Sequence, residues 1–162
     1  MEPRIETLAP KKLIGMHRRM SLAQNTAVEL WRRFMPKRTE IRNRADSMYI
    51  SMNVFPEGQK GLLSTKTFFE KWAAVEVTSY DMLPEGMETY TLQGGKYAVF
   101  IHKGPASAFP KTMQHIFVNW LPDSEYELDN REHFEILSED YNPNDPEAEE
   151  EVWVPVKYSK QQ

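Results

Sequence analysis

No cysteine occurs among the 162 residues of this chain. Without thiols the protein can form neither a disulfide scaffold nor a cysteine-ligated metal site, and it has no thiol nucleophile. No apolar run approaches the roughly 18 residues of a membrane-spanning helix, and the N-terminus lacks the apolar core of a secretion signal. We therefore expect a soluble, cytoplasmic protein without a membrane partner. A single domain over residues 1–162 is expected, since a chain of this length can bury a sufficient core.

The usual patterns for metal, phosphate and acyl-group chemistry are also missing. The chain has four histidines, His17, His102, His115 and His133. None of them stands at metal-ligand spacing. The acidic run at 145–151 lacks the glycine and the alternating ligands of a calcium loop, so we interpret it as a solvent-exposed loop between two strands. There is neither a phosphate-binding loop nor a G-x-S-x-G nucleophile elbow, and we expect no metal and no cofactor.

The formal net charge of −4 is unevenly spread along the chain. Residues 1–44 carry a net charge of +7, residues 45–122 carry −1, and residues 123–162 carry −10. Such asymmetry is typical of opposite-sign surfaces that meet within one fold or between subunits. The acidic total disfavours a nucleic-acid partner. The basic cluster at 32–44 is interpreted as a solvated helix end, because no aromatic residue interleaves its later members.

Two halves of the chain resemble each other weakly. Trp31-Arg-Arg-Phe-Met-Pro36 matches Phe117-Val-Asn-Trp-Leu-Pro122 at an offset of 86 residues, and Trp72-Ala-Ala-Val75 matches Trp153-Val-Pro-Val156 at an offset of 81. Two further short similarities occur in the same order. We therefore predict an internal duplication, with halves at about 1–80 and 85–158.

Each half is predicted to fold as strand, helix, strand, strand. Apolar residues at helical spacing predict helices over 22–34 and 105–120, with Ser21 as N-cap and Pro36 as the stop of the first helix. Gly94-Gly95 is interpreted as a hairpin turn. Alternating patterns predict strands over 4–8, 12–19, 48–55, 71–78, 88–92, 96–103, 132–138 and 151–157. The predicted fold class is α+β, with duplicated β-α-β-β units, antiparallel sheets and two main helices.

Side-chain alternation along the strands predicts which residues share a sheet face. Val152, Val154 and Val156 are expected to pack under a helix, together with the residues of 48–55 and 132–138 that include Ile50 and Phe134. The helix-free face is then predicted to collect Tyr49, Trp72, Glu135 and Trp153. A carboxylate among aromatic rings attracts organic cations, or acts as a base with a raised pKa. The alternatives of an exposed strand glutamate and core tryptophans stay open.

The second half carries a recognisable series of motifs: Gly95-Lys-Tyr-Ala-Val-Phe100, His102-Lys-Gly-Pro105, Trp120-Leu-Pro122, Phe134-Glu135 and Glu151-Val-Trp-Val-Pro-Val156. With them, residues 3–157 resemble the GyrI-like small-molecule-binding domain, also called the bacterial transcription activator effector-binding domain. That family includes the DNA gyrase inhibitory protein and the ligand domains of multidrug-responsive regulators. The resemblance implies a pseudo-twofold repeat of SH2-like motifs with a ligand cleft between the halves.

In the family, the equivalents of Glu135 and Trp153 lie in that cleft, which implies the same place for these two residues here. Relatives often have a tyrosine where this chain has Leu137, so a cleft hydroxyl is expected to be missing. No helix-turn-helix precedes the first strand, and we expect a stand-alone module.

The resemblance implies that the protein binds or senses a small aromatic or cationic amphipathic molecule. The expected ligand-binding residues are Glu135, Trp153, Trp72, Tyr49 and Leu137. Two alternatives stay open. One is a hydrolase of strained electrophilic rings, in which Glu135 activates water and Tyr49 assists. The other is a regulator that, like the gyrase inhibitor, binds a protein partner.

Overall fold

The structure is a computed structural model that describes residues 1–62 and 64–159. Its strands are β1 (Arg4–Leu8), β2 (Lys11–Met20), β3 (Tyr49–Val54), β4 (Phe69–Val77), β5 (Glu88–Leu92), β6 (Gly95–Lys103), β7 (Tyr126–Leu128), β8 (His133–Leu137) and β9 (Glu149–Tyr158). Its helical segments are α1 (Ala27–Phe34), η1 (Met35–Glu40), η2 (Ala106–Ala108), α2 (Phe109–Gln114), η3 (His115–Trp120) and α3 (Leu121–Asp123).

The strand order shows an internal symmetry. Eight strands form an antiparallel sheet in the order β1-β6-β9-β8-β3-β4-β2-β5, and β7 pairs with β9. The order is the same from either end when β1 is exchanged for β5, β6 for β2, β9 for β4 and β8 for β3. Strands β3 and β8 therefore hold equivalent places in the two halves. The predicted α+β fold with repeated β-α-β-β units is confirmed.

Two bent arms connect the ends of this sheet. Strand β1 continues into β2 and β5 continues into β6, while β1 pairs with β6 and β2 pairs with β5. The predicted hairpin at Gly94-Gly95 is wrong, because β5 and β6 are consecutive parts of one arm and do not pair with each other. Gly94 has a φ of 86°, and a side chain there would overlap the carbonyl of Leu8 on the neighbouring arm. Glycine is required where the arms bend together.

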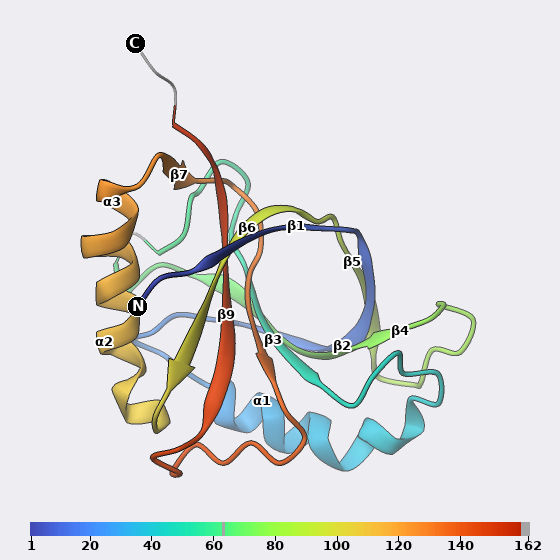
Figure 1. The fold of residues 1–162 in the computed structure, drawn as a ribbon. Coiled ribbons are helices and arrows are strands. Elements are labelled where there is room, and N and C mark those ends of the chain that lie inside the picture. The colour runs from blue at the N-terminus through green and yellow to red at the C-terminus, as the bar shows by residue number, and fades with distance from the viewer. Residues whose placement is uncertain (63, 160–162) are drawn as a thin grey trace.

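The bent arms curl the sheet into an open barrel with the helices outside it (Figure 1). Its concave face encloses the inner cluster, which is Leu13, Ile50, Met52, Trp72, Ala74, Leu92, Tyr97, Val99, Phe134 and Trp153. Because successive side chains of a strand point to opposite faces, the residues between these point outward.

Two separate apolar clusters cover the outer face. Leu30 and Phe34 of α1 pack in the α1 cluster, whose sheet residues include Ala73 and Val75. Ile116 of the second helical segment packs in the α2 cluster, with Ala98, Phe100, Val152, Val154 and Val156. Both helices thus lie on the same side of the sheet, and the valines of β9 pack under a helix, as their alternation predicts.

The first helix differs from its prediction at both ends. Ser21 does not cap it; its hydroxyl accepts a hydrogen bond from the amide of Gln24 at 3.1 Å, and α1 begins only at Ala27. Pro36 does not end the helical segment either, because it lies in the first turn of the following 3-10 helix η1, where a missing N–H costs nothing. No helix in the described part of the chain is long and apolar enough to cross a membrane.

Candidate functional site

The two outer clusters are separated by a polar row at the centre of the sheet. Glu135 on β8 is paired with Ser51 on β3 and with Val152 on β9, and Ser51 is paired with Ala73 on β4. Directly paired residues point to the same face of a sheet. Ala73 belongs to the α1 cluster and Val152 to the α2 cluster. Glu135 therefore lies on the outer face, at the junction of the two halves.

We call the outward residues of β3 and β8 the central strip; they are Tyr49, Ser51, Asn53, His133, Glu135 and Leu137. Tyr49 and Leu137 reach into the α1 cluster at one end of the strip. The other four belong to neither outer cluster. Glu135 is partly exposed and Ser51 is buried.

The predicted common face of Tyr49, Trp72, Glu135 and Trp153 is wrong. Trp153 is paired with Phe134, not with Glu135, and both Trp72 and Trp153 lie in the inner cluster. Ile50 and Phe134, which were expected under a helix, lie in the inner cluster as well. The alternation along β3 and β8 is as expected, but the set of residues expected on the helix-free face lies on the helix side, and the other set lies inside.

The two tryptophans are packed among other side chains. Trp153 stacks on Phe134 with ring centroids 5.2 Å apart and donates a hydrogen bond from Nε1 to Glu151 at 3.0 Å. Trp72 stacks on His17 at 4.5 Å and is 5 % exposed, as is Trp153. Their contact with a ligand stays a prediction, but the sheet separates them from Glu135.

Different aromatic residues flank the central strip. At one end, Trp31 of α1 meets Tyr49 edge-on with ring centroids 6.1 Å apart. At the other end, His133 contacts Phe55 at 5.1 Å and Phe117 at 6.3 Å.

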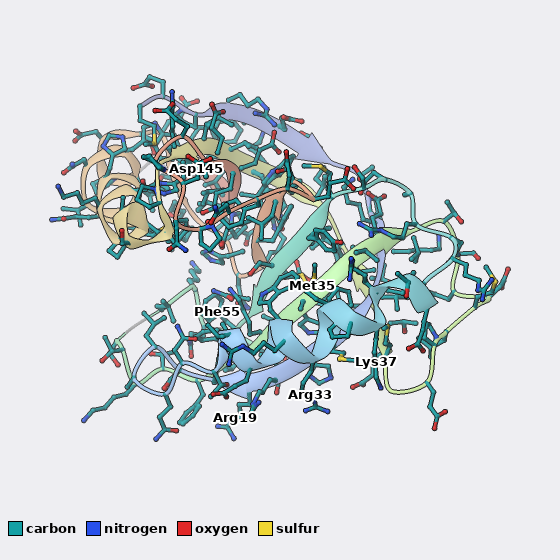
Figure 2. All side chains as sticks on the ribbon, turned by 90° about the horizontal axis from the view of Figure 1, so that it is seen from below. Arg19, Arg33, Met35, Lys37, Phe55 and Asp145 are labelled. Atoms are coloured by element: carbon teal, nitrogen blue, oxygen red, sulfur yellow. The ribbon has the colours of Figure 1, made fainter. Side chains whose placement is uncertain are left out.

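Figure 2 shows how the two sides of β3 are occupied. Viewed from below, Met35 and Phe55 lie toward the α1 side and Asp145 lies on the opposite side. Arg19, Arg33 and Lys37 project from the α1 side away from Asp145. These labelled basic residues therefore do not face the acidic segment across the sheet.

Two carboxylates lie near each other on the outer face. Glu150 precedes Val152 by two residues on β9, so its side chain points to the same face as that of Glu135. Burial raises the pKa of Glu135, while the charges of Lys71 and His102 act in the opposite direction. Burial and the neighbouring Glu135 raise the pKa of Glu150 to about 8. At neutral pH the pair therefore does not carry two full negative charges.

The charge of Lys71 acts against the rise in the pKa of both carboxylates, but Lys71 forms no ion pair with either of them. Glu135 and Glu150 form no hydrogen bond or ion pair with any residue in 1–62 or 64–159. Tyr141 lies close enough that burial, Glu150 and Glu135 raise its pKa to about 12. An unpaired, partly desolvated carboxylate is a favourable site for a cation.

His102 is fixed beside this pair. It is paired across the strands with Glu150 and is buried. Its Nε2 donates to the carbonyl of Pro105 at 3.2 Å, and its Nδ1 lies 2.6 Å from the hydroxyl of Thr112. Both ring nitrogens are engaged in these two contacts. His102 therefore supports the site and has no free nitrogen for acid–base chemistry.

The far end of the strip holds two buried polar atoms without partners. Asn53 is paired with His133, and both Asn53 Oδ1 and His133 Nε2 lack a hydrogen-bond partner among the described residues. Burial and the charge of Arg131 lower the pKa of His133 to about 4, so its imidazole is neutral at physiological pH. The charge of the central strip therefore comes from Glu135.

Sequence reasoning missed Glu150, Lys71, His102 and Tyr141. The acidic run at 145–151 was interpreted as a solvent-exposed loop, but β9 already begins at Glu149 and Glu150 is 7 % exposed. The signal that was available is alternation, because Glu150 continues the outward series of Val152, Val154 and Val156. No set of three or more possible metal-ligating side chains gathers anywhere in the described residues.

The chain belongs to the family of GyrI-like small molecule binding domains, whose sequence pattern matches residues 1–157. The family and the α+β fold expected from the motifs are thereby confirmed. Among curated proteins it is similar to the transcriptional regulator BrlR of Pseudomonas aeruginosa, with 28% identity over 159 residues. That alignment covers 96% of this chain and 56% of BrlR, so the chain spans about half the length of this regulator.

Solved structures share the fold. The structure of SAV2435 bound to tetraphenylphosphonium has a TM-score of 0.74 at 19% identity, over 97% of this chain and 94% of that one. The EcmrR C-terminal domain has a TM-score of 0.72 at 14% identity, over 98% of both chains.

Proposed function

We propose that this domain binds lipophilic organic cations on the central strip, with Glu135 as the counter-charge. The observation that carries the proposal is the Glu135 carboxylate, which lies at the junction of the halves without a hydrogen-bond or ion-pair partner among the described residues. A bound cation stabilises the ionised carboxylate, which burial otherwise disfavours. Binding and ionisation of Glu135 therefore favour each other.

The aromatic residues at the two ends of the strip supply the apolar contacts. Tyr49 with Trp31, and Phe55 with Phe117, offer ring surfaces on either side of Glu135. A cation over an aromatic ring gains roughly 0.5–2 kcal/mol, more when both are desolvated. Leu137 adds aliphatic surface next to Tyr49. Tetraphenylphosphonium, which SAV2435 holds, combines a delocalised positive charge with apolar rings and suits such a surface.

Fluorescence titration tests the proposal. We expect tetraphenylphosphonium to quench tryptophan fluorescence of the wild-type protein, and Glu135→Gln to weaken this binding by on the order of tenfold or more, since a tenfold change corresponds to about 1.4 kcal/mol of lost charge interaction. Triphenylphosphine oxide, a neutral ligand of similar shape, should bind both proteins equally. Glu139→Gln, an exposed glutamate next to the same strand, is the matched control. Wild-type affinity for the cation in Glu135→Gln would refute the proposal.

The same variant separates binding from hydrolysis. If the domain is an enzyme acting on strained electrophilic rings, Glu135→Gln abolishes turnover while ligands still bind. Turnover by the wild-type protein, absent in the variant, would favour the hydrolase over the binding module. The Tyr141 hydroxyl lies near enough to Glu150 and Glu135 for their charges to raise its pKa. In such an enzyme Tyr141, and not Tyr49, would be the assisting residue.

A further inference from the structure

We propose a second, smaller binding site on the other side of the sheet, for a small organic ammonium ion. A pocket of about 230 Å³ opens at one end of the barrel. It is lined by Val54, Phe55 and Glu57 at the end of β3, by Tyr90 of β5, and by residues 130–132 before β8. Glu132 is its buried carboxylate, at 7 % exposure.

This pocket is separate from the central strip. Tyr97, in the inner cluster, donates a hydrogen bond from its hydroxyl to the Glu132 carbonyl at 2.9 Å. The Tyr90 hydroxyl donates to Glu132 Oε2, and its ring packs on Trp72 at 5.3 Å. Glu132 is therefore attached to the inner side of the sheet, whereas Glu135, three residues later, points outward. A ligand in the pocket and a ligand on the strip do not compete for a carboxylate.

The pocket contains a buried acceptor oxygen that lacks a hydrogen-bond donor. Glu132 Oε2 accepts from Tyr90, but Oε1 is buried and has no partner among the described residues. The exposed carboxylate of Glu57 has no partner in that part of the chain either. A buried carboxylate oxygen without a partner is costly, and a ligand N–H would satisfy it.

Arg131 lines the pocket, but its guanidinium forms its hydrogen bonds with other groups of the protein. Its Nε donates to Asp129 at 2.7 Å, and its other nitrogens donate to the carbonyls of Gly94 at 3.1 Å, Lys96 at 2.5 Å and Val156 at 3.2 Å. The ion pair with Asp129 offsets its charge. The uncompensated charges that line the pocket are therefore the two carboxylates, which selects a cation over an anion.

Size and shape narrow the ligand further. The pocket volume is below the ~300–1,000 Å³ of pockets for drug-sized ligands. A ligand with a single ring and a short ammonium chain is small enough for this pocket. The side chains of Val54 and Tyr90, which pack against the inner cluster, provide the apolar walls. Tetraphenylphosphonium is too large, and it has no N–H to donate to Glu132. The two sites thus differ in ligand chemistry: a bulky cation without donors on the strip, and a small donor cation in the pocket.

Calorimetric titration with 2-phenylethylammonium tests the second site, with 2-phenylethanol as the neutral control. We expect the ammonium ion to bind the wild-type protein with equal affinity in the absence and presence of saturating tetraphenylphosphonium, and at least about tenfold more tightly than the alcohol. Glu132→Gln should lower the affinity for the ammonium ion by on the order of tenfold and change the affinity for tetraphenylphosphonium by less than about twofold. Glu135→Gln should do the reverse.

A second variant covers the case in which the buried Glu132→Gln does not fold. Glu57→Gln, at an exposed position, should lower the affinity for the ammonium ion about two- to threefold. Glu85 is an exposed glutamate outside the pocket, and Glu85→Gln should leave this affinity unchanged. Amide shifts on titration should concentrate at 54–57, 90 and 130–132. The proposal is overturned if the ammonium ion does not bind, if tetraphenylphosphonium displaces it, or if Glu135→Gln removes its binding. Failure of the strip proposal alone would leave the ammonium affinities of the wild-type protein, Glu132→Gln and Glu57→Gln unchanged.

Discussion

The polar and aromatic side chains on the two faces of the sheet differ in the contacts that they make. On the inner face aromatic rings stack on each other, as Phe134 does on Trp153, and His17 is held between Glu70 at 2.8 Å and Glu88 at 2.6 Å. On the outer face Glu135 and Glu150 have no such partners among the described residues. Among the described residues, Glu132 at the mouth of the barrel keeps a buried oxygen without a partner on the inner side. The proposed binding of cations on the central strip rests on this contrast between paired groups on the inner face and carboxylates without close partners at the centre of the outer face.

The largest expected effect concerns the inner face. Trp153→Ala removes a ring from a packed interior and should lower the free energy of unfolding by about 3–5 kcal/mol. Tetraphenylphosphonium affinity should change less than about twofold as long as the variant is folded, because the sheet separates Trp153 from Glu135. Urea unfolding and fluorescence titration measure the two quantities. Val118→Ala, at an exposed position, should cost less than about 0.5 kcal/mol. A tenfold loss of affinity in folded Trp153→Ala would show that the inner face belongs to the ligand site.

A smaller effect is expected at the unpaired carboxylates. The pKa of Glu150 rises from its usual 4.5 to about 8 on folding, so the folded state holds this proton more tightly than the unfolded state. The resulting stability is fully present below pH 4.5 and is lost as the pH rises through about 8. Relative to wild type, Glu150→Gln should therefore gain on the order of 2 kcal/mol between pH 5 and pH 8.5.

Unfolding free energies of both proteins at several pH values measure this difference. The exposed neighbour Glu149 offers the control, since Glu149→Gln should leave the pH dependence as in wild type. A stability difference between Glu150→Gln and wild type that does not change with pH would mean that the outer-face carboxylates are compensated after all.

The smallest effect is expected at the paired polar group of the inner face. Burial alone would lower the pKa of His17, but the hydrogen bonds to Glu70 and Glu88 outweigh it and raise the pKa. The stabilisation from these contacts is complete below the usual His pKa of 6.5 and is lost as the pH rises through the raised value. His17→Gln should therefore cost about 0.5–1 kcal/mol more at pH 5.5 than at pH 8.5, a modest amount because both glutamates are largely solvated. Equal costs at the two pH values would contradict the pairing.

The elements and the duplication were predictable from the sequence because they depend on local patterns. The two halves that the weak matches predict occupy symmetric places in the strand order. Glu135 was also recognisable through its Phe-Glu motif, whereas the parity argument that grouped it with the two tryptophans was wrong. The bend at Gly94 was not recognisable, since two glycines favour a hairpin turn and a bent arm alike. Pairing across distant strands decided between them.

The choice of sheet face depended on the tertiary structure alone. In β3 and β8 both sets of alternating positions contain apolar residues: Tyr49 and Leu137 outward, Ile50, Met52, Phe134 and Ile136 inward. Both faces are buried, one inside the barrel and one beside the helices, so alternation cannot distinguish them. A shift of one residue exchanges every side chain between the faces. The sequence thus determined the strands, the duplication and the central glutamate. Only the packed register decided that Glu135 faces outward between the two halves while the tryptophans lie inside.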